Sequence, residues 1–300
     1  MLTTLFGFAL MASAITTNKI LLGALSPALF VSVRMGIAGA VLFAYHILYK
    51  SKRSWRCYIN DVPRFCAIAL FTTMLPSLLK AYALSHLPSS YAALIGSIDP
   101  FVTALYAYAL WDQRITARQL SGMLLGFISV TVVIALSQSQ GCWSNWYSLC
   151  SIPSLAAILA VFLNRYGWIT ARNIMRHKNY SSGETTGLIM LFGSFFALCS
   201  AVIGSDLEIN QPITLRLALT MLYTIIAGNI YGYNIYAHSI QRLPLTTVSL
   251  LGLSIPFFVH IFGVAFLGEQ TSTIFIAALV LMTIGTAIFV TDPHTRTQKD

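Results

Sequence analysis

An aspartate inside an apolar stretch is the first candidate for chemistry in this chain. Asp99 lies near the middle of the stretch 89–110, directly before Pro100, whose missing N–H leaves one backbone carbonyl without its helical partner. An ionisable residue at the centre of a membrane helix costs about 2.5–3.5 kcal/mol on insertion, so such a residue is a candidate for a functional role. We interpret Asp99 as a counter-charge for a cationic substrate or as a proton-coupling site. The alternative is an aspartate that is protonated or paired inside the protein and holds helices together.

Basic residues inside apolar stretches form the second group of candidates. Arg34 is the deepest, about 10 Å along the stretch 27–49 at ~1.5 Å per residue, and its planar guanidinium suits a carboxylate or phosphate. Arg165 is a second candidate of the same kind. Lys19 and Lys80 lie nearer the ends of their stretches, where long basic side chains often extend to the membrane interface. We therefore predict that Arg34 contacts an anionic group of the substrate.

The stretch 228–238 combines polar and aromatic residues more densely than any other part of the sequence. Asn229, Tyr233 and Tyr236 are spaced i, i+4 and i+7, so they share one face of a helix. Aromatic faces attract cations within about 6 Å and stack on planar rings, although aromatic packing between helices would give the same pattern. We expect a cavity here, and the residues predicted to bind substrate are Arg34, Tyr82, Tyr91, Asp99, Trp168, Asn229, Tyr233, Tyr236 and Phe257.

Metal and enzymatic chemistry are not indicated by the sequence. The five cysteines form no CxxC pair and no cluster with histidine at metal-ligand spacing, so we predict no metal and no cofactor. Of the nine acidic residues, no two lie i to i+4 within one apolar stretch, as a membrane enzyme with paired carboxylates would need. Cys142 and Cys150 share one predicted loop, where an oxidising compartment could pair them or leave both free.

The composition is that of a membrane protein. Hydrophobic residues make up 57% of the 300 residues and charged residues only 9%, against about 25% charged in soluble chains, and the mean hydropathy is +0.74. The length accommodates roughly ten helices of about 20 residues. We predict an all-α integral membrane protein with ten spans at about 2–22, 27–49, 64–85, 89–110, 117–136, 150–171, 184–204, 214–238, 243–267 and 271–291.

The distribution of Lys and Arg predicts the orientation. Thirteen of the 18 fall in ends and loops on one side of the predicted membrane, including the loops 50–63 and 172–183, and only Arg216 falls on the other. Cytoplasmic loops carry such an excess, so both termini are predicted to be cytoplasmic, in a bacterial inner membrane. The net charge of +9 thus has a topological cause, and we do not expect nucleic acid as a partner.

The segment 88–134 repeats itself 156 positions later. Gly96 aligns with Gly252 and Pro100 with Pro256, whereas Asp99 aligns with Ile255, so the repeated scaffold does not itself require a carboxylate. With five spans in each half, an odd number, the second copy must enter the membrane from the opposite side. Inverted repeats around a midplane site are typical of secondary transporters. The predicted units are a first repeat at 1–136, an external linker at 137–149, a second repeat at 150–291 and a cytoplasmic tail at 292–300.

Several short strings resemble a known family. They are the run Ala81-Tyr82-Ala83-Leu84-Ser85-His86-Leu87-Pro88, Pro100 inside the fourth span, Pro27 with Arg34 seven residues on, and Leu267-Gly268-Glu269 before a last span that contains Gly285. They are similar to the EamA-type branch of the drug/metabolite transporter superfamily. The resemblance covers nearly the whole chain and implies two tandem five-helix units that transport a metabolite. One departure is Gln113, beside Asp112, at the position that matches Glu269.

Together these features predict a secondary transporter, not an enzyme, that moves a small amphoteric metabolite by alternating access. An aspartate, one or two arginines and an aromatic cluster suit an ammonium or sulfonium, a carboxylate and a flat ring. Amino acids fit this description, and S-adenosylmethionine fits all three parts. The alternatives are an antiporter of phosphorylated or nucleotide-type metabolites, which would want more cations in its cavity, and an integral-membrane lipid-modifying enzyme. The expected partners are the metabolite and the lipid bilayer, with the protein acting as a monomer.

Overall fold

The computed structural model is helical throughout the residues that it describes. These are residues 2–49, 55–111, 116–137, 151–204, 207, 209, 212, 214–243, 248, 251–252, 254–269 and 273–290. Within them, the only extended pairing is an isolated antiparallel bridge between Leu25 and Ile209. The predicted tail, the predicted linker beyond Ser137, the cysteines at 142 and 150, and residues 112 and 113 lie outside the described residues.

The first half of the chain contains long helices and one helix that is interrupted. The elements are α1 (Leu2–Leu22), α2 (Pro27–Tyr49), the continuous run of α3 (Trp55–Ala69), the π-helical η1 (Leu70–Met74) and α4 (Leu75–His86), then α5 (Ser89–Gly96), α6 (Asp99–Trp111) and α7 (Ala117–Ser137). The second half has a similar order. Its elements are α8 (Ile152–His177), α9 (Ser182–Ile203), the continuous run of α10 (Leu215–Tyr223), the π-helical η3 (Thr224–Tyr233) and α11 (Asn234–Arg242), then α13 (Ser254–Leu267) and α14 (Thr273–Val290).

Six of these helical segments are long and apolar enough to cross a membrane. They are Thr3–Leu22, Pro27–Tyr49, Cys57–His86, Tyr91–Leu110, Ile152–His177 and Ser182–Ile203, and two shorter apolar helices lie at Ser254–Leu267 and Phe275–Gly285. The spans predicted at 2–22 and 27–49 coincide with α1 and α2. The all-helical membrane class is therefore confirmed for the described residues.

Two predicted loops are shorter in the structure than the sequence suggested. The predicted loop 50–63 is helical from Trp55, and the predicted loop 172–183 is helical to His177 and again from Ser182. Hydropathy ends a span where charged residues begin, but helical backbone hydrogen bonds continue through charged residues. Here the charged side chains also find partners in a polar cluster, which stabilises the extended helix ends.

That cluster is built around two buried carboxylates. Asp61 accepts hydrogen bonds from Lys178, from Arg64 Nη1 at 3.1 Å and from Tyr180 Oη at 3.0 Å. Because Lys178 and Tyr180 lie between α8 and α9, their hydrogen bonds to Asp61 tie α3 to that loop.

Glu184, in the first turn of α9, is held in the same way. Tyr58 donates a hydrogen bond to one oxygen, and the other lies 3.4 Å from His46 Nε2 and 3.1 Å from the backbone nitrogen of Ser181. Ser181 in turn accepts from the backbone of Glu184, which completes a capping box. The residues named in this paragraph and the last form the Asp61–Glu184 cluster.

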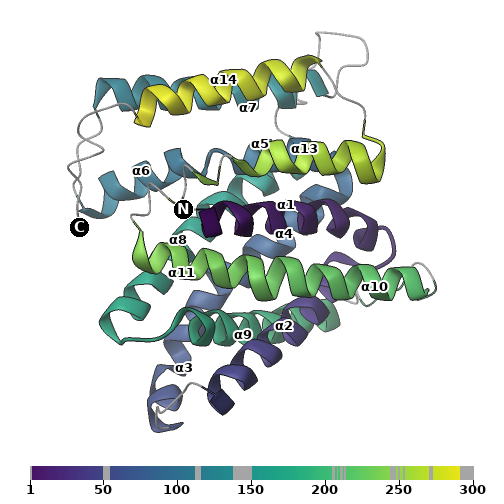
Figure 1. Ribbon diagram of the computed structural model, residues 1–300, viewed down its shortest axis with the longest axis vertical. Helices are drawn as coiled ribbons and strands as arrows, with labels where there is room; N and C mark the ends of the chain where they lie inside the picture. The colour runs from purple at the N-terminus through teal and green to yellow at the C-terminus, as the bar shows by residue number, and fades with distance from the viewer. Residues whose placement is uncertain are drawn as a thin grey trace.

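Corresponding helices of the two halves pack on each other. Figure 1 shows α7 beside α14 at one end of the molecule and α2 with α9 nearer the other end. The helix α1 packs on η3 and α13 of the second half, and α8 packs on α4, α5 and α6 of the first half. Each half therefore inserts its first helix against the third and fourth helical segments of the other.

Glycines allow the closest of these approaches. A Cβ atom at Gly39 of α2 would lie 2.8 Å from the backbone nitrogen of Leu191 in α9. A Cβ atom at Gly285 of α14 would lie 2.8 Å from the carbonyl oxygen of Gly122 in α7. Both contacts are with backbone, which cannot move aside, so a side chain at either position would separate the helices.

The break between α5 and α6 places Asp99 differently from the continuous helix that we expected. The chain turns at Ser97 and Ile98, and α6 starts at Asp99, with Pro100 in its first turn, where a missing N–H costs nothing. A carboxylate in the first turn of a helix also interacts favourably with the helix dipole. Asp99 thus belongs to the start of a discontinuous helix, an arrangement that transporters use at substrate sites.

Candidate substrate-binding cavity

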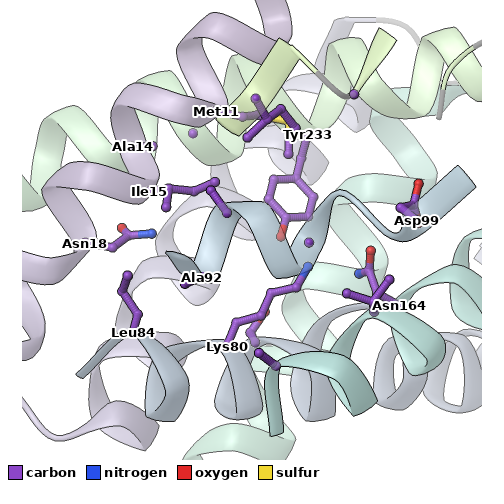
Figure 2. Close-up of a pocket in the computed structure, with 18 of the residues that line it drawn as sticks. Met11, Ala14, Ile15, Asn18, Lys80, Leu84, Ala92, Asp99, Asn164 and Tyr233 are labelled. Atoms are coloured by element: carbon purple, nitrogen blue, oxygen red, sulfur yellow. The ribbon is translucent and has the colours of Figure 1, made fainter. Parts of the chain in front are cut away.

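A cavity of about 210 Å³ lies where the two halves meet. Side chains from α1, α2, α4, α5, α8, η3, α11 and α13 form its walls, together with the start of α6. Figure 2 shows Lys80 and Tyr233 pointing toward one another across it, with Asn18 to one side and Asp99 and Asn164 to the other. Six of the nine predicted residues line the cavity: Arg34, Asp99, Trp168, Asn229, Tyr233 and Tyr236.

Asp99 forms an ion pair with Arg165 of α8 at one wall. Arg165 Nε donates to Asp99 Oδ1 at 2.8 Å and Arg165 Nη2 donates to the second oxygen, so the pair is bidentate. Arg165 is 1% exposed, whereas the Asp99 side chain keeps 24% of its surface accessible. The internally paired aspartate of our sequence-based alternatives is therefore present, and its carboxylate still borders the cavity.

Arg34 is buried in the cavity wall without a carboxylate beside it. The residue is 7% exposed, its guanidinium lies 4.8 Å from the centre of the Phe30 ring, and its Nε has no hydrogen-bond partner. A cation over an aromatic face recovers only part of the free energy lost by leaving water. Within the described part of the chain no acidic residue forms an ion pair with Arg34, so it can accept an anion from outside the protein.

Lys80 adds a second cation, for which the sequence left the membrane interface open as an alternative. In the structure its side chain reaches into the cavity (Figure 2). The helical face that carries Lys80 also presents Ala81, Ala83 and Leu84 to the same space. Small neighbours on that face leave room for the long side chain, and no carboxylate among the described residues pairs with it.

The described cavity lining is positively charged. It contains the cations Arg34, Lys80 and Arg165 and one carboxylate, Asp99. Since Arg165 and Asp99 neutralise each other, the charges of Arg34 and Lys80 remain. The cavity should therefore attract a ligand with a carboxylate or phosphate.

Several buried polar atoms of the cavity wall lack a hydrogen-bond partner. They are Asn18 Oδ1, Arg34 Nε, Arg165 Nη1 and both polar atoms of the Asn229 amide. Each such buried, unpaired group costs about 1–3 kcal/mol, so an arrangement that collects five of them around one cavity is expensive for the protein alone. A polar ligand in the cavity would supply partners to these groups.

Aromatic side chains close one end of the cavity. Trp168 packs edge-on against Tyr236 at 4.9 Å between ring centres and lies 6.2 Å from Tyr233, and Phe8 contacts Tyr236 at 6.1 Å. Trp168 is fully buried in this packing, whereas Tyr233 and Tyr236 are only partly buried. The two tyrosines therefore have ring surface available to a planar group of a ligand.

Comparison with known proteins decides the family. The model of the EamA-like transporter family matches residues 1–135 and 151–291. The chain belongs to the EamA-like transporter family. Members of this family are transporters and not enzymes, so this EamA protein is a membrane transporter-family protein and not an enzyme.

Several relatives of this EamA protein have descriptive names. The S-adenosylmethionine/S-adenosylhomocysteine transporter of Chlamydia muridarum (strain MoPn / Nigg) is 26% identical over 278 residues, which cover 91% of this chain and 86% of the relative. The protein of the same name from Chlamydia trachomatis serovar L2 is 25% identical and covers 91% and 84%. A probable amino-acid metabolite efflux pump of Salmonella typhimurium is 25% identical over 68% of each chain.

A solved structure shows the same fold. It superposes with a TM-score of 0.67 over 95% of both chains at 19% sequence identity, and its title, "Crystal structure of protein", gives no activity. At this identity the likeness concerns the fold alone.

Three predicted residues of this EamA protein lie away from the cavity, so the expectation that they surround it is wrong. Tyr82 packs on His86 at 4.6 Å and Tyr91 on Phe275 at 5.9 Å, while Phe257 is 44% exposed on the outside of α13. Each lies two helix positions from a cavity-lining residue, and two steps of about 100° turn a side chain to the opposite face.

Proposed function

We propose that this EamA protein is a secondary transporter that carries a small amphoteric metabolite across the membrane by alternating access. The observation that carries the proposal is Arg34, a buried arginine that pairs with no acidic residue among those described, in a cavity that Lys80 and the Asp99–Arg165 pair also line. A carboxylate of the substrate would bind Arg34 and Lys80, and a planar ring would lie against Tyr233. Family membership supports transport, and the cavity chemistry supports the class of substrate.

S-adenosyl compounds are the specific candidates. Relatives named as S-adenosylmethionine/S-adenosylhomocysteine transporters are about a quarter identical to this chain, which supports the class without deciding the ligand. S-adenosylhomocysteine is a zwitterion with no net charge, whereas the sulfonium of S-adenosylmethionine makes it a net cation. Because Arg34 and Lys80 form no ion pair within the described part of the chain and Asp99 is already bound to Arg165, we infer that S-adenosylhomocysteine binds more tightly than S-adenosylmethionine.

A thermal-shift screen on the purified protein tests this assignment, since only a ligand that binds the folded state stabilises it. S-adenosylhomocysteine should raise the melting temperature most, followed by S-adenosylmethionine. Arg34→Gln should strongly reduce the shift, and Arg216→Gln, which removes an exposed arginine at the start of α10, should not. No shift with any adenosyl compound or amino acid would contradict the proposal, and radiolabelled uptake into vesicles then tests transport itself.

A phosphorylated or nucleotide-type metabolite is the second candidate, and Lys80 is the observation that favours it. We expected such a substrate to need more cavity cations than Arg34 and Arg165, and Lys80 provides one. Adding nucleoside monophosphates to the same screen distinguishes the two candidates. A larger shift with the phosphate than with S-adenosylhomocysteine would select the phosphate.

For the architecture, we propose ten membrane helices in two inverted five-helix repeats, at 1–136 and 150–291, joined by an external linker. The exchanged packing of α1 and α8, the pairing of α2 with α9 and the two separate matches to the family model support this arrangement. We also propose that both termini are cytoplasmic in a bacterial inner membrane and that the monomer is the transporting unit. In a variant without its native cysteines, a cysteine at Ser54 should react only from the cytoplasmic side.

A further inference from the structure

A second hollow lies outside the transport cavity, on the surface where α3 and η1 meet α8. It is a groove of about 500 Å³ whose lining shares no residue with the cavity. One end is polar and basic, and the other end is apolar and aromatic. A groove with this division of chemistry matches a molecule with an anionic head and an apolar chain.

The basic end presents Arg64, His177 and Lys178. Arg64 Nη1 lies 3.1 Å from Asp61 Oδ1 and Lys178 donates to the same oxygen, so one carboxylate holds the two cationic groups side by side. Asp61 itself is buried and does not line the groove. The surface of this end is therefore cationic, and no acidic residue appears among the described residues of the lining.

The apolar end is formed mainly by Phe71 and Tyr166, whose rings meet edge to face at 5.3 Å between centres. Ala67 is exposed in the groove between these rings and the basic end. Gly167 forms part of the floor, since a Cβ atom there would lie 2.6 Å from the backbone nitrogen of Thr72. The glycine thus lets the helices approach closely at the floor, and the short side chain of Ala67 leaves the groove above it open.

The dimensions of the groove correspond to one leaflet of a bilayer. From Lys178 to Tyr166 the helix α8 advances twelve residues, about 18 Å at ~1.5 Å per residue. Half of a hydrocarbon core of about 30 Å is about 15 Å. With the basic end at the interface, the aromatic end lies near the bilayer midplane, and the distribution of Lys and Arg predicts the cytoplasmic leaflet.

We propose that this groove binds an anionic phospholipid of the inner leaflet. The headgroup phosphate lies between Arg64, His177 and Lys178, and one acyl chain runs along Ala67 toward Phe71 and Tyr166. Basic pockets between membrane helices recognise anionic headgroups in this way, and charge-assisted hydrogen bonds to phosphate supply the selectivity. This inference does not depend on the identity of the transported substrate.

Native mass spectrometry of the full chain, purified in detergent with added lipid, tests the proposal. The wild-type protein should retain phosphatidylglycerol at least fivefold more than phosphatidylcholine with the same acyl chains. Arg64→Gln should lower phosphatidylglycerol retention about fivefold, because one cation near a headgroup contributes about that factor. Arg242→Gln is the matched control, an exposed arginine at the end of α11 outside the groove, and should leave retention unchanged.

A second variant tests the apolar end without changing any charge. Ala67→Phe fills the channel and should reduce retention of phosphatidylglycerol while the elution profile of the protein stays that of the wild type. Equal retention of the two lipids by the wild type, or equal retention by the Arg64 and Arg242 variants, would overturn the proposal. So would competition by inorganic phosphate at the concentration of the lipid, because the site would then recognise a free anion.

Discussion

The Asp61–Glu184 cluster and the candidate substrate-binding cavity differ in whether their buried polar groups have partners within the protein. In the cluster, Asp61 and Glu184 each have several partners from other elements, and cations and carboxylates match. Among the described residues of the cavity, Arg34 Nε and the Asn229 amide have no partner, and cations outnumber carboxylates. Both regions are costly to desolvate, but only the cluster offsets that cost within the protein.

This difference separates structural polar groups from groups available to a ligand. The carboxylate of Glu184, which has partners on α3, α2 and the α8–α9 loop, fixes the relative positions of these elements. A buried arginine without a carboxylate contributes nothing comparable to the fold. Mutations in the two regions should therefore affect different properties, stability in one and ligand binding in the other.

The largest effect is expected in the cluster. Glu184→Ala removes the partner of Tyr58, His46 and the backbone of Ser181, and the buried groups left unpaired together cost about 3–5 kcal/mol, at about 1–3 kcal/mol each. The free energy of unfolding in mixed detergent should fall by about this amount. Ligand affinity of the protein that remains folded should be unchanged, and a stable Glu184→Ala protein would refute the structural role.

The second-largest effect is expected on ligand binding, at the cavity. Arg34→Gln removes a charge-assisted hydrogen bond to the substrate anion, so affinity should fall about 30-fold, on the order of 2 kcal/mol. The free energy of unfolding should stay the same or rise, because the variant buries no unpaired charge. Isothermal titration and detergent unfolding on one preparation measure both. A clear loss of stability with unchanged affinity would place Arg34 with the structural groups.

Asp99 lies between these two classes, because it has an internal partner and also borders the cavity. If it contacts a cationic group of the substrate, Asp99→Asn should lower affinity about tenfold, on the order of 1.4 kcal/mol. If it couples protons, the variant should retain substrate exchange and lose the response to a pH gradient. If binding, exchange and pH-driven uptake are all normal, the role of Asp99 is only structural, as the partner of Arg165.

The smallest effect is expected at the partly exposed ion pair of Lys19 with Glu269. Lys19 Nζ lies 3.3 Å from Glu269 Oε1, and about a third of the lysine side chain is exposed. Glu269 also accepts from the backbone nitrogen and hydroxyl of Ser89, so Lys19→Gln leaves it with partners. Stability should fall by less than about 1 kcal/mol, as for other exposed pairs. If Lys19→Gln lowers the free energy of unfolding as much as Glu184→Ala does, the degree of burial does not determine how much a polar contact contributes to stability.

Helical periodicity allowed part of the cavity to be predicted. Asn229, Tyr233 and Tyr236 share one face because they belong to one continuous segment, and all three line the cavity. The intramembrane location of Arg34 and Asp99 made them candidates whatever their neighbours. Lys80 was not among the predicted site residues because it lies near the end of its apolar stretch, where long basic side chains often extend to the interface. The small residues Ala81 and Ala83 on the same face could have identified it.

The aromatic residues show where such reasoning fails. Tyr82, Tyr91 and Phe257 were included for their chemical type, and the structure packs them on His86, on Phe275 and on the outside of α13. An aromatic ring can face any neighbouring helix at little difference in free energy. Its orientation therefore depends on helix packing, which composition does not reveal.

The sequence by itself determined the membrane class, the family, the helix bounds of α1 and α2 and the identity of the ionisable residues inside the apolar stretches. These properties depend on hydropathy and local spacing, which each segment carries independently. Only the tertiary structure decided that Arg165 binds Asp99 while Arg34 and Lys80 stay without a carboxylate. That outcome depends on which helices of the two halves meet, since an ion pair forms only when packing brings residues 66 positions apart within hydrogen-bond distance.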